Sequence, residues 1–192
     1  IGLDPGLCPR ATVVIMAKPL HPSPPVLSRD GVSLTVANTR RNLPEALSPQ
    51  IKSTNFLNNI LAKRESIAAG TFDSLFLNWK DELTECTVSN LFFISGKTLH
   101  TPALDCGILD GITRTIVMTL AQEEGVPVRE GHYHLADLQR AEECFLTNTS
   151  MEIMPVNRVD SFAIGDGRPG SLTRRLQTRF ADSRTRFLEP PS

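Results

Sequence analysis

The sequence lacks several features that would place it in a specialised class of protein. Its 192 residues contain no apolar run of membrane-spanning length, and the longest, at residues 11–17, is the size of a strand. The formal net charge is −1, which does not favour nucleic acid or an anionic membrane as a partner. The four cysteines form no CxxC pair, which favours free thiols over disulfides. These absences predict a cytoplasmic protein with no nucleic-acid and no membrane partner.

The N-terminal end has neither an initiator methionine nor a signal peptide. The first residue is Ile1, and residues 1–6 have the character of the interior of a longer sequence. The composition, 40% hydrophobic and 21% charged, is ordinary for a globular domain with its own core. We expect residues 1–30 to be the end of an N-terminal domain and its connection, with the rest of that small domain absent. Residues 31–185 are expected to form the large domain, and residues 186–192 a flexible tail.

Hydrophobic patterning predicts a mixed α/β (α+β) domain. Val32, Leu34 and Val36 alternate with small or polar residues, which indicates a strand within residues 31–40. Residues 54–69 carry apolar side chains at helical spacing and precede a glycine, which indicates a helix. Further strands are expected at residues 10–18, 74–79, 90–95, 98–100, 126–129, 143–147 and 153–159, and further helices at 113–124, 135–142 and 170–180. Because strands and helices do not alternate regularly, a partly closed, barrel-like sheet with flanking helices is favoured over a doubly wound sheet.

Four segments follow one another in a characteristic order. They are residues 50–57 (QIKSTNFL), 84–93 (TECTVSNLFF), 107–114 (GILDGITR) and 146–156 (LTNTSMEIMPV). Lys52 alone, in a loop before a predicted helix, would be one surface lysine among several. Taken together, the segments resemble the class IV aminotransferases, which include branched-chain aminotransferases, D-amino-acid aminotransferases and aminodeoxychorismate lyases. The likeness runs from about residue 1 to about residue 180 and implies the large domain of a fold-type IV enzyme.

The resemblance implies pyridoxal 5′-phosphate as the cofactor and assigns the central steps of the cofactor chemistry to two residues. Lys52 matches the lysine whose amine bonds to the cofactor aldehyde and later moves a proton, a task that favours shielding from water. Glu85 matches the acid that keeps the pyridine nitrogen protonated. The simpler interpretation of Glu85 is a solvated acid in a turn between two strands.

The resemblance also assigns the cofactor phosphate and ring. Ile112 and Thr113 stand at the start of a predicted helix, where free N–H groups suit an anion, although Thr113 could equally cap that helix. Leu109 matches the residue that packs against the ring. The remaining cofactor contacts fall on Ser89, Asn90, Asn148 and Thr149, and the substrate-binding turn on Thr149 and Ser150. A polar hairpin turn would explain the residues of that turn as well.

Departures from the family pattern leave the substrate open. Phe56 stands where branched-chain enzymes usually have a tyrosine, and Cys86 follows Glu85 where glycine is usual, as in some lyases. Residues 39–52 and 164–176 nevertheless look most like branched-chain enzymes. The preferred hypothesis is a homodimeric transaminase that acts on a branched-chain-like amino acid and a 2-oxo acid such as 2-oxoglutarate. The alternatives are an aminodeoxychorismate lyase, a D-amino-acid aminotransferase, or an impaired fragment that only binds or dimerises.

Two further patterns favour simple explanations. Residues 165–170 match G-x-G-x-x-G, but the chain ends before the second strand and acidic residue that a dinucleotide site needs, so a turn is expected. His132 and His134 flank Tyr133, and no cysteine or carboxylate stands at a convincing metal-ligand spacing. We therefore expect surface histidines and no metal.

Overall fold

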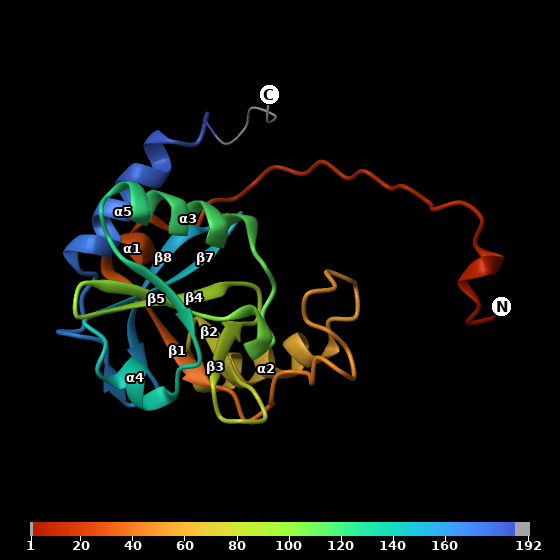
Figure 1. Cartoon of the computed structure of the whole chain (residues 1–192), viewed down its shortest axis with the longest axis horizontal. Coiled ribbons are helices and arrows are strands. Elements are labelled where there is room, and N and C mark those ends of the chain that lie inside the picture. The colour runs from red at the N-terminus through yellow and green to blue at the C-terminus, as the bar shows by residue number, and fades with distance from the viewer. Residues whose placement is uncertain (1, 187–192) are drawn as a thin grey trace.

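The computed structural model describes residues 2–186, and its body begins near residue 25 (Figure 1). Residues 8–24 leave that body as an extended segment without regular structure. The prediction of a strand at residues 10–18 is therefore wrong. Val13 and Ile15 are 80% and 90% exposed. An isolated run of β-branched residues does not form a strand, because a strand needs a neighbour to take its backbone hydrogen bonds.

Nine strands and five α-helices are present in the part of the chain that the structure describes. The strands are β1 (Val32–Val36), β2 (Asp73–Leu77), β3 (Leu83–Cys86), β4 (Asn90–Ser95), β5 (Thr98–Pro102), β6 (Val128–Gly131), β7 (Glu143–Asn148), β8 (Glu152–Val159) and β9 (Phe162–Ala163). The helices are α1 (Pro25–Asp30), α2 (Leu57–Ala69), α3 (Ile112–Glu123), α4 (Leu135–Gln139) and α5 (Ser171–Asp182), with 3-10 turns η1 (Pro5–Leu7) and η2 (Leu104–Cys106). Most predicted elements are found with ends moved by a few residues. Strands β3 and β9 and helix α1 were not predicted.

The strands form one sheet that closes on itself. Its order is β3-β2-β1-β8-β7-β4-β5-β6, β9 pairs with β8, and an extra pairing of β3 with β4 joins the two ends of a six-strand barrel. Strand β1 runs parallel to its neighbours β2 and β8. Strand β7 runs antiparallel to its neighbours β4 and β8. This arrangement confirms the expected mixed α/β domain with a barrel-like sheet.

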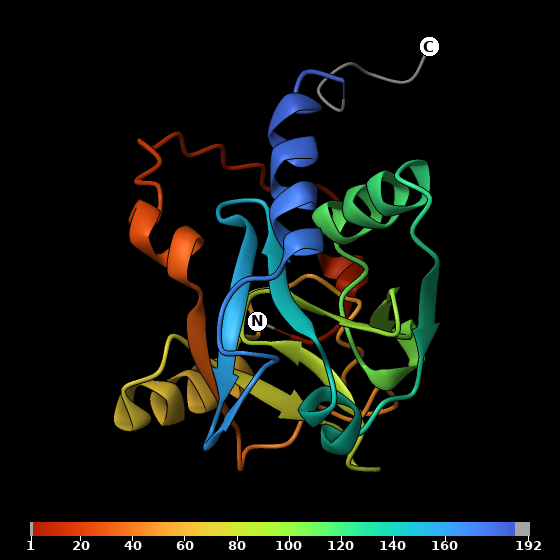
Figure 2. The same ribbon diagram turned by 90° about the vertical axis from the view of Figure 1, so that its left-hand side faces the viewer.

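Strand β4 explains how the core is divided. Leu91 and Phe93 belong to the apolar cluster on one face of the sheet, and Phe92 and Ile94 belong to the cluster beneath α3 and α5. Because both faces are covered, residues 91–94 form an unbroken apolar run between the polar ends of the strand. Figure 2 shows α3 and α5 together over the second face. None of the described helices is long and apolar enough to cross a membrane.

Candidate active site

A cavity of about 380 Å³ opens where four connections of the barrel meet. They are the loop between β1 and α2, the β3–β4 turn, the segment before α3 and the β7–β8 turn. The volume falls within the roughly 300–1,000 Å³ typical of small-molecule sites. The lining includes Lys52, Glu85, Ser89, Asn90, Leu109, Ile112, Thr113, Asn148 and Thr149. The fold therefore brings the sequence-predicted residues together, while Ser150 stands next to this lining in the β7–β8 turn.

Glu85 is a buried acid at the wall of this cavity. It lies on β3 opposite Asn90 of β4 and is only 5% exposed, so the interpretation as a solvated turn acid is wrong. One carboxylate oxygen, Oε2, accepts hydrogen bonds from Asn90 Nδ2 at 3.1 Å and from the Leu109 N–H at 3.0 Å. The other, Oε1, forms an ion pair with the Arg41 guanidinium. These contacts fix the carboxylate in one orientation.

The electrostatic surroundings make Glu85 responsive to an added cation. Burial raises the pKa of Glu85 to about 7, and Arg41, the Leu109 N–H and Lys52 oppose that rise. The carboxylate is therefore close to taking up a proton at neutral pH. A cationic N–H group placed against it from the cavity would favour the charged form.

Arg41 lines the cavity and pairs with Glu85, and the sequence reasoning did not identify it as a site residue. Its side chain is buried at 7% exposure, its Nε donates to the Gly107 carbonyl at 3.1 Å, and its guanidinium stands 5.2 Å from the centre of the Phe76 ring. Burial lowers the pKa of Arg41, and Glu85 partly offsets this. The signal was the Arg40-Arg41 pair, which begins four residues after the end of β1, but composition could not tell which arginine faces inward.

The start of α3 faces the cavity as an anion site would. The helical hydrogen bonds begin with the Thr115 N–H, which donates to the Gly111 carbonyl at 3.0 Å, so the preceding N–H groups are free of the helix. The N-cap is Gly111 and has no side-chain cap bond, so Thr113 is not the cap. A Cβ at Gly111 would lie 2.2 Å from Asn90 Oδ1, which explains why glycine stands there. The start of α3 and the Asn90 side chain thus lie close to each other.

Two buried hydroxyl groups in the cavity wall have no partner within the described residues. They are Ser89 Oγ and Thr147 Oγ1, on the β3–β4 turn and on β7. A buried hydroxyl without a hydrogen bond costs free energy, so both groups suit a polar ligand. Together with the free end of α3, they fit a phosphorylated cofactor.

Asn148 uses its side chain for hydrogen bonds to other groups of the protein. Its Oδ1 accepts from the Ser150 and Met151 N–H groups at 2.9 and 2.8 Å, and its Nδ2 donates to the Val88 carbonyl at 3.2 Å. These bonds use its polar atoms to shape the β7–β8 turn. The turn in turn presents Thr149 to the cavity.

Lys52 lies at the cavity rim, on the loop that Figure 1 shows standing out from the body before α2. Its side chain is exposed, which differs from the expected shielded lysine. Within this part of the loop the bonds are local, such as the Asn55 N–H to Ser53 Oγ at 3.3 Å and the Phe56 N–H to the Thr54 carbonyl at 2.9 Å. The loop therefore reaches the cavity without being covered by the barrel.

Comparison with known proteins agrees with this geometry. Residues 2–159 match the family model of amino-transferase class IV. A putative branched-chain-amino-acid aminotransferase of Methanocaldococcus jannaschii is 38% identical over 97% of this chain and 64% of that protein. A D-alanine aminotransferase of Listeria monocytogenes is 38% identical over 71% of this chain and 47% of its own length. The aminodeoxychorismate lyase of Bacillus subtilis is 34% identical over 88% of this chain and 56% of its own length.

Solved structures show the same fold. The branched-chain amino acid aminotransferase of Escherichia coli is 31% identical, with a TM-score of 0.80 over 82% of this chain and 52% of that one. The T.th. branched-chain amino acid aminotransferase, 29% identical with a TM-score of 0.78 over 81% of this chain and 52% of its own, was solved with N-(5′-phosphopyridoxyl)-L-glutamate. Pyridoxal 5′-phosphate is the cofactor of this family.

The chain spans about half to two thirds of the length of the curated relatives described above. The match to the family model nevertheless covers most of the chain, including β1 to β8 and the whole cavity wall. On the fold, the cavity and these matches, the chain belongs to the class IV aminotransferase family.

Proposed function

We propose that this chain provides the cofactor-binding wall of a pyridoxal-phosphate-dependent aminotransferase. The observation that carries the proposal is the placement of Glu85, a buried acid held by Arg41, Asn90 and Leu109 at one side of a cavity. The other walls offer the free end of α3 and two unpartnered hydroxyls. An acid for a ring nitrogen and donors for a phosphate are the two polar features that the cofactor requires.

The roles of the side chains follow from their positions. When bound, the cofactor withdraws electrons from the substrate α-carbon. Glu85 would hold the proton on the pyridine nitrogen, and Arg41 would keep the Glu85 carboxylate oriented. Lys52 Nζ would bond to the cofactor aldehyde and, once released, carry the proton that leaves the α-carbon. Leu109 would pack on the ring, which excludes water from that face.

The N–H groups of Ile112 and Thr113 would bind the phosphate, with the hydroxyls of Ser89, Thr113 and Thr149 as further partners. Asn90 would hold the Leu109 carbonyl, to which its Nδ2 donates at 2.8 Å. Asn148 would support the turn that carries Thr149 and Ser150 toward the substrate carboxylate.

The substrates we propose are a branched-chain-like amino acid and a 2-oxo acid such as 2-oxoglutarate. The likeness to the putative branched-chain enzyme covers 97% of the chain, which supports this choice. An aminodeoxychorismate lyase is the second candidate, supported by 34% identity over 168 residues and by Cys86 after Glu85. Nothing in the comparisons supports the interpretation as a fragment that only binds or dimerises. We further propose a cytoplasmic homodimer in which residues 31–185 are the cofactor-binding domain and residues 1–30 belong to the connection before it.

Covalent labelling tests the cofactor site. Borohydride reduction of the cofactor-loaded protein should fix the cofactor on the peptide that contains Lys52. Lys52→Ala should lose both the label and transamination, while Lys80→Ala, at an exposed lysine beside Trp79, should keep both. A label on Lys63, Lys80 or Lys97 instead would overturn the assignment.

Substrate assays separate the two candidate enzymes. Leucine, isoleucine or valine with 2-oxoglutarate should give glutamate if the transaminase proposal is right. D-Alanine in place of the L-amino acids tests the D-amino-acid alternative. Release of pyruvate from 4-amino-4-deoxychorismate, without glutamate formation, would instead identify the lyase.

A further inference from the structure

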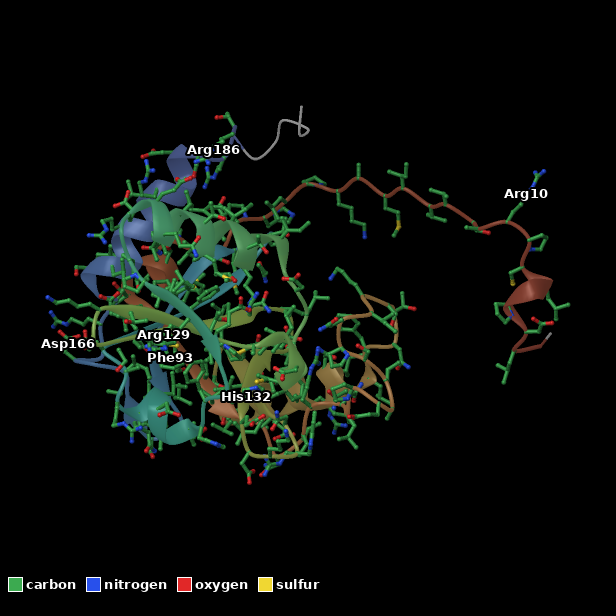
Figure 3. The ribbon with its side chains drawn as sticks, viewed as in Figure 1. Arg10, Phe93, Arg129, His132, Asp166 and Arg186 are labelled. Carbon is green, nitrogen blue, oxygen red and sulfur yellow. The ribbon has the colours of Figure 1, made fainter. Side chains whose placement is uncertain are left out.

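A second polar cluster lies at the other end of β3, outside the cofactor cavity. It consists of Glu82 before β3, Cys106 at the end of η2 and His132 after β6, whose ligand atoms lie within 4.8 Å of one another. Cys106 and Glu82 are 0% and 8% exposed, whereas His132 is partly open to solvent. Figure 3 labels His132 on the lower part of the globular body, away from the extended N-terminal segment. His132 is exposed, as expected for a surface histidine, but it also contacts the buried Glu82 and Cys106.

One ring nitrogen of His132 faces both other members of the cluster. His132 Nδ1 is 3.1 Å from Glu82 Oε1 and 3.6 Å from Cys106 Sγ. For tetrahedral zinc, bond lengths of about 2.0–2.3 Å put a nitrogen and an oxygen ligand roughly 3.3 Å apart, and a nitrogen and a sulfur ligand roughly 3.5 Å apart. The two distances from Nδ1 thus already match those between zinc ligands, and all three ligand atoms lie within 4.8 Å of one another.

The far side of the ring has the partner that a metal-bound histidine usually has. His132 Nε2 lies 3.3 Å from Asp105 Oδ2. With an ion on Nδ1 in place of its proton, a carboxylate that accepts from Nε2 would fix that tautomer and raise the basicity of Nδ1 as a ligand. On the other flank, Asn78 Nδ2 donates to Glu82 Oε2 at 2.7 Å and to the Cys106 carbonyl at 3.2 Å. Two of the three ligands therefore share one buried orienting side chain.

The backbone holds the cluster independently of these side-chain contacts. The Leu83 N–H donates to the Tyr133 carbonyl at 2.6 Å, and Glu82 forms a bridge with His134. These contacts keep the segment after β6 beside the start of β3. The ligands thus come from three separate segments on a rigid frame, which lowers the ordering cost of binding an ion.

We propose that Glu82, Cys106 and His132 form a binding site for a thiophilic divalent cation of the zinc class, with Asp105 as the orienting carboxylate outside the first sphere. Imidazole, thiolate and carboxylate together suit zinc better than magnesium or calcium, which prefer oxygen ligands alone. Binding would release the Cys106 thiol proton to solvent as the thiolate–metal bond forms.

The site would act on the cofactor cavity through the chain. Cys106 is followed by residues 107–109, in which the Gly107 carbonyl accepts from Arg41 and the Leu109 N–H donates to Glu85. An ion that ties Cys106 to β3 would stiffen this segment. Occupancy should therefore raise the thermal stability of the protein, and it should slow local opening around residues 104–109.

Cobalt provides the test, because its spectrum reports both the ligands and the geometry. The protein would be prepared reduced and chelator-treated, in a Cys8→Ser background that removes the exposed thiol. One equivalent of Co²⁺ should give a thiolate charge-transfer band and the intense visible bands of a tetrahedral ion, and Zn²⁺ should displace it. Absence of that charge-transfer band at saturating Co²⁺ would overturn the proposal.

Variants distinguish a metal site from a cluster of ordinary hydrogen bonds. Cys106→Ser should remove the charge-transfer band, and His132→Ala, at a partly exposed position that tolerates truncation, should weaken Co²⁺ binding more than 100-fold. Asp105→Asn should weaken it by about 10- to 100-fold, as is typical of outer-sphere partners. The matched control is His134→Ala, since His134 Nδ1 contacts only the Asp81 carbonyl among the polar contacts described for its ring. Equal losses in His134→Ala and His132→Ala, or a band that survives Cys106→Ser, would show adventitious binding and refute the site.

Discussion

Glu82, directly before β3, and Glu85, within β3, stand three positions apart, and the protein shifts their pKa values in opposite directions. Both are nearly buried, at 8% and 5% exposed. Burial raises the pKa of Glu85 to about 7. Burial also acts to raise the pKa of Glu82, but hydrogen bonds from Asn78 and His132 outweigh it, and that pKa lies below its ordinary value.

The difference lies in what surrounds each carboxylate. Glu82 is enclosed by donors from the protein itself, so its charge is already stabilised. Glu85 has one ion pair and two neutral donors, and beyond them lies an open cavity with unpartnered hydroxyls. The surroundings of Glu85 are therefore those of a site that a ligand completes. Three substitutions, each with a matched control, and one pH profile test this contrast.

The largest effect is expected from removing the cation beside Glu85. Arg41→Met should lower the free energy of unfolding by about 3–5 kcal/mol, because it leaves a buried carboxylate without its partner. Urea unfolding at pH 8, where Glu85 is mostly ionised, measures this. The control is Arg40→Met, which breaks an exposed pair with Asp81 at 2.6 Å and should cost about 0–1 kcal/mol. Equal losses in the two variants would contradict the burial contrast.

A smaller effect is expected on turnover from changing the acid itself. Glu85→Gln keeps the shape of the side chain and removes its charge toward the ring nitrogen. Losing a charge-assisted hydrogen bond of roughly 1.5–3 kcal/mol should lower kcat by about 10- to 100-fold. Glu142→Gln makes the same chemical change at an exposed position, where the side chain accepts a hydrogen bond from the Gly96 N–H. This variant should leave kcat unchanged. An unaltered kcat in Glu85→Gln would mean that Glu85 does not support the ring.

The raised pKa of Glu85 gives the cofactor-free protein a definite pH dependence. A carboxyl whose folded pKa is above its unfolded value stabilises the fold below the unfolded pKa, and this contribution is lost as pH rises through the folded pKa. Stability should therefore fall between about pH 4.5 and about pH 7, by roughly 1–3 kcal/mol. Thermal unfolding of the wild type and Glu85→Gln across that range measures it. A wild-type curve that runs parallel to that of the variant would contradict the assigned direction.

Local patterns predicted the elements wherever the pattern also decides the packing. The alternation at Val32, Leu34 and Val36 gives β1, and the glycine after residue 69 ends α2 as expected. Residues 10–18 have a strand composition but no neighbouring strand among the described residues, so composition misled there. Strand β3 was missed because its four residues carry two polar side chains and yet face inward on both sides. Tertiary burial, which local sequence does not encode, decided both cases.

Some residues of the candidate site could be predicted from the sequence, and others could be found only in the structure. The family motifs identified Lys52, Glu85 and the α3 start as neighbours, and the cavity brings them together, while their roles stay predictions. Arg41 could not be separated from Arg40 without the three-dimensional structure. His132 could not be paired with Glu82 and Cys106, because it stands 50 and 26 residues from them along the chain. No local spacing rule covers ligands that three distant segments supply.

The smallest effect is expected from an unpartnered hydroxyl in the cavity wall. Thr147→Val keeps the shape of the buried side chain and removes Oγ1, which has no partner within the described residues. Since no protein hydrogen bond is lost, the stability of the cofactor-free protein should be unchanged or slightly higher. If the cavity holds the cofactor as proposed, its affinity should fall by roughly 2- to 10-fold, the equivalent of one hydrogen bond of about 0.5–1.5 kcal/mol. Fluorescence titration with pyridoxal phosphate measures that affinity.

The matched control for Thr147→Val is Thr101→Val, at an equally buried threonine whose hydroxyl donates to the Leu91 carbonyl at 2.8 Å. There the substitution leaves a buried carbonyl with one partner fewer, so stability should fall by about 1 kcal/mol while cofactor affinity stays the same. The two variants make the same chemical change with opposite expected results. Thr147→Val should lower cofactor affinity and keep stability, whereas Thr101→Val should lower stability and keep cofactor affinity. If Thr147→Val loses as much stability as Thr101→Val, its hydroxyl already has a partner in the free protein. The contrast between an open cavity wall and a satisfied core would then be wrong at that position.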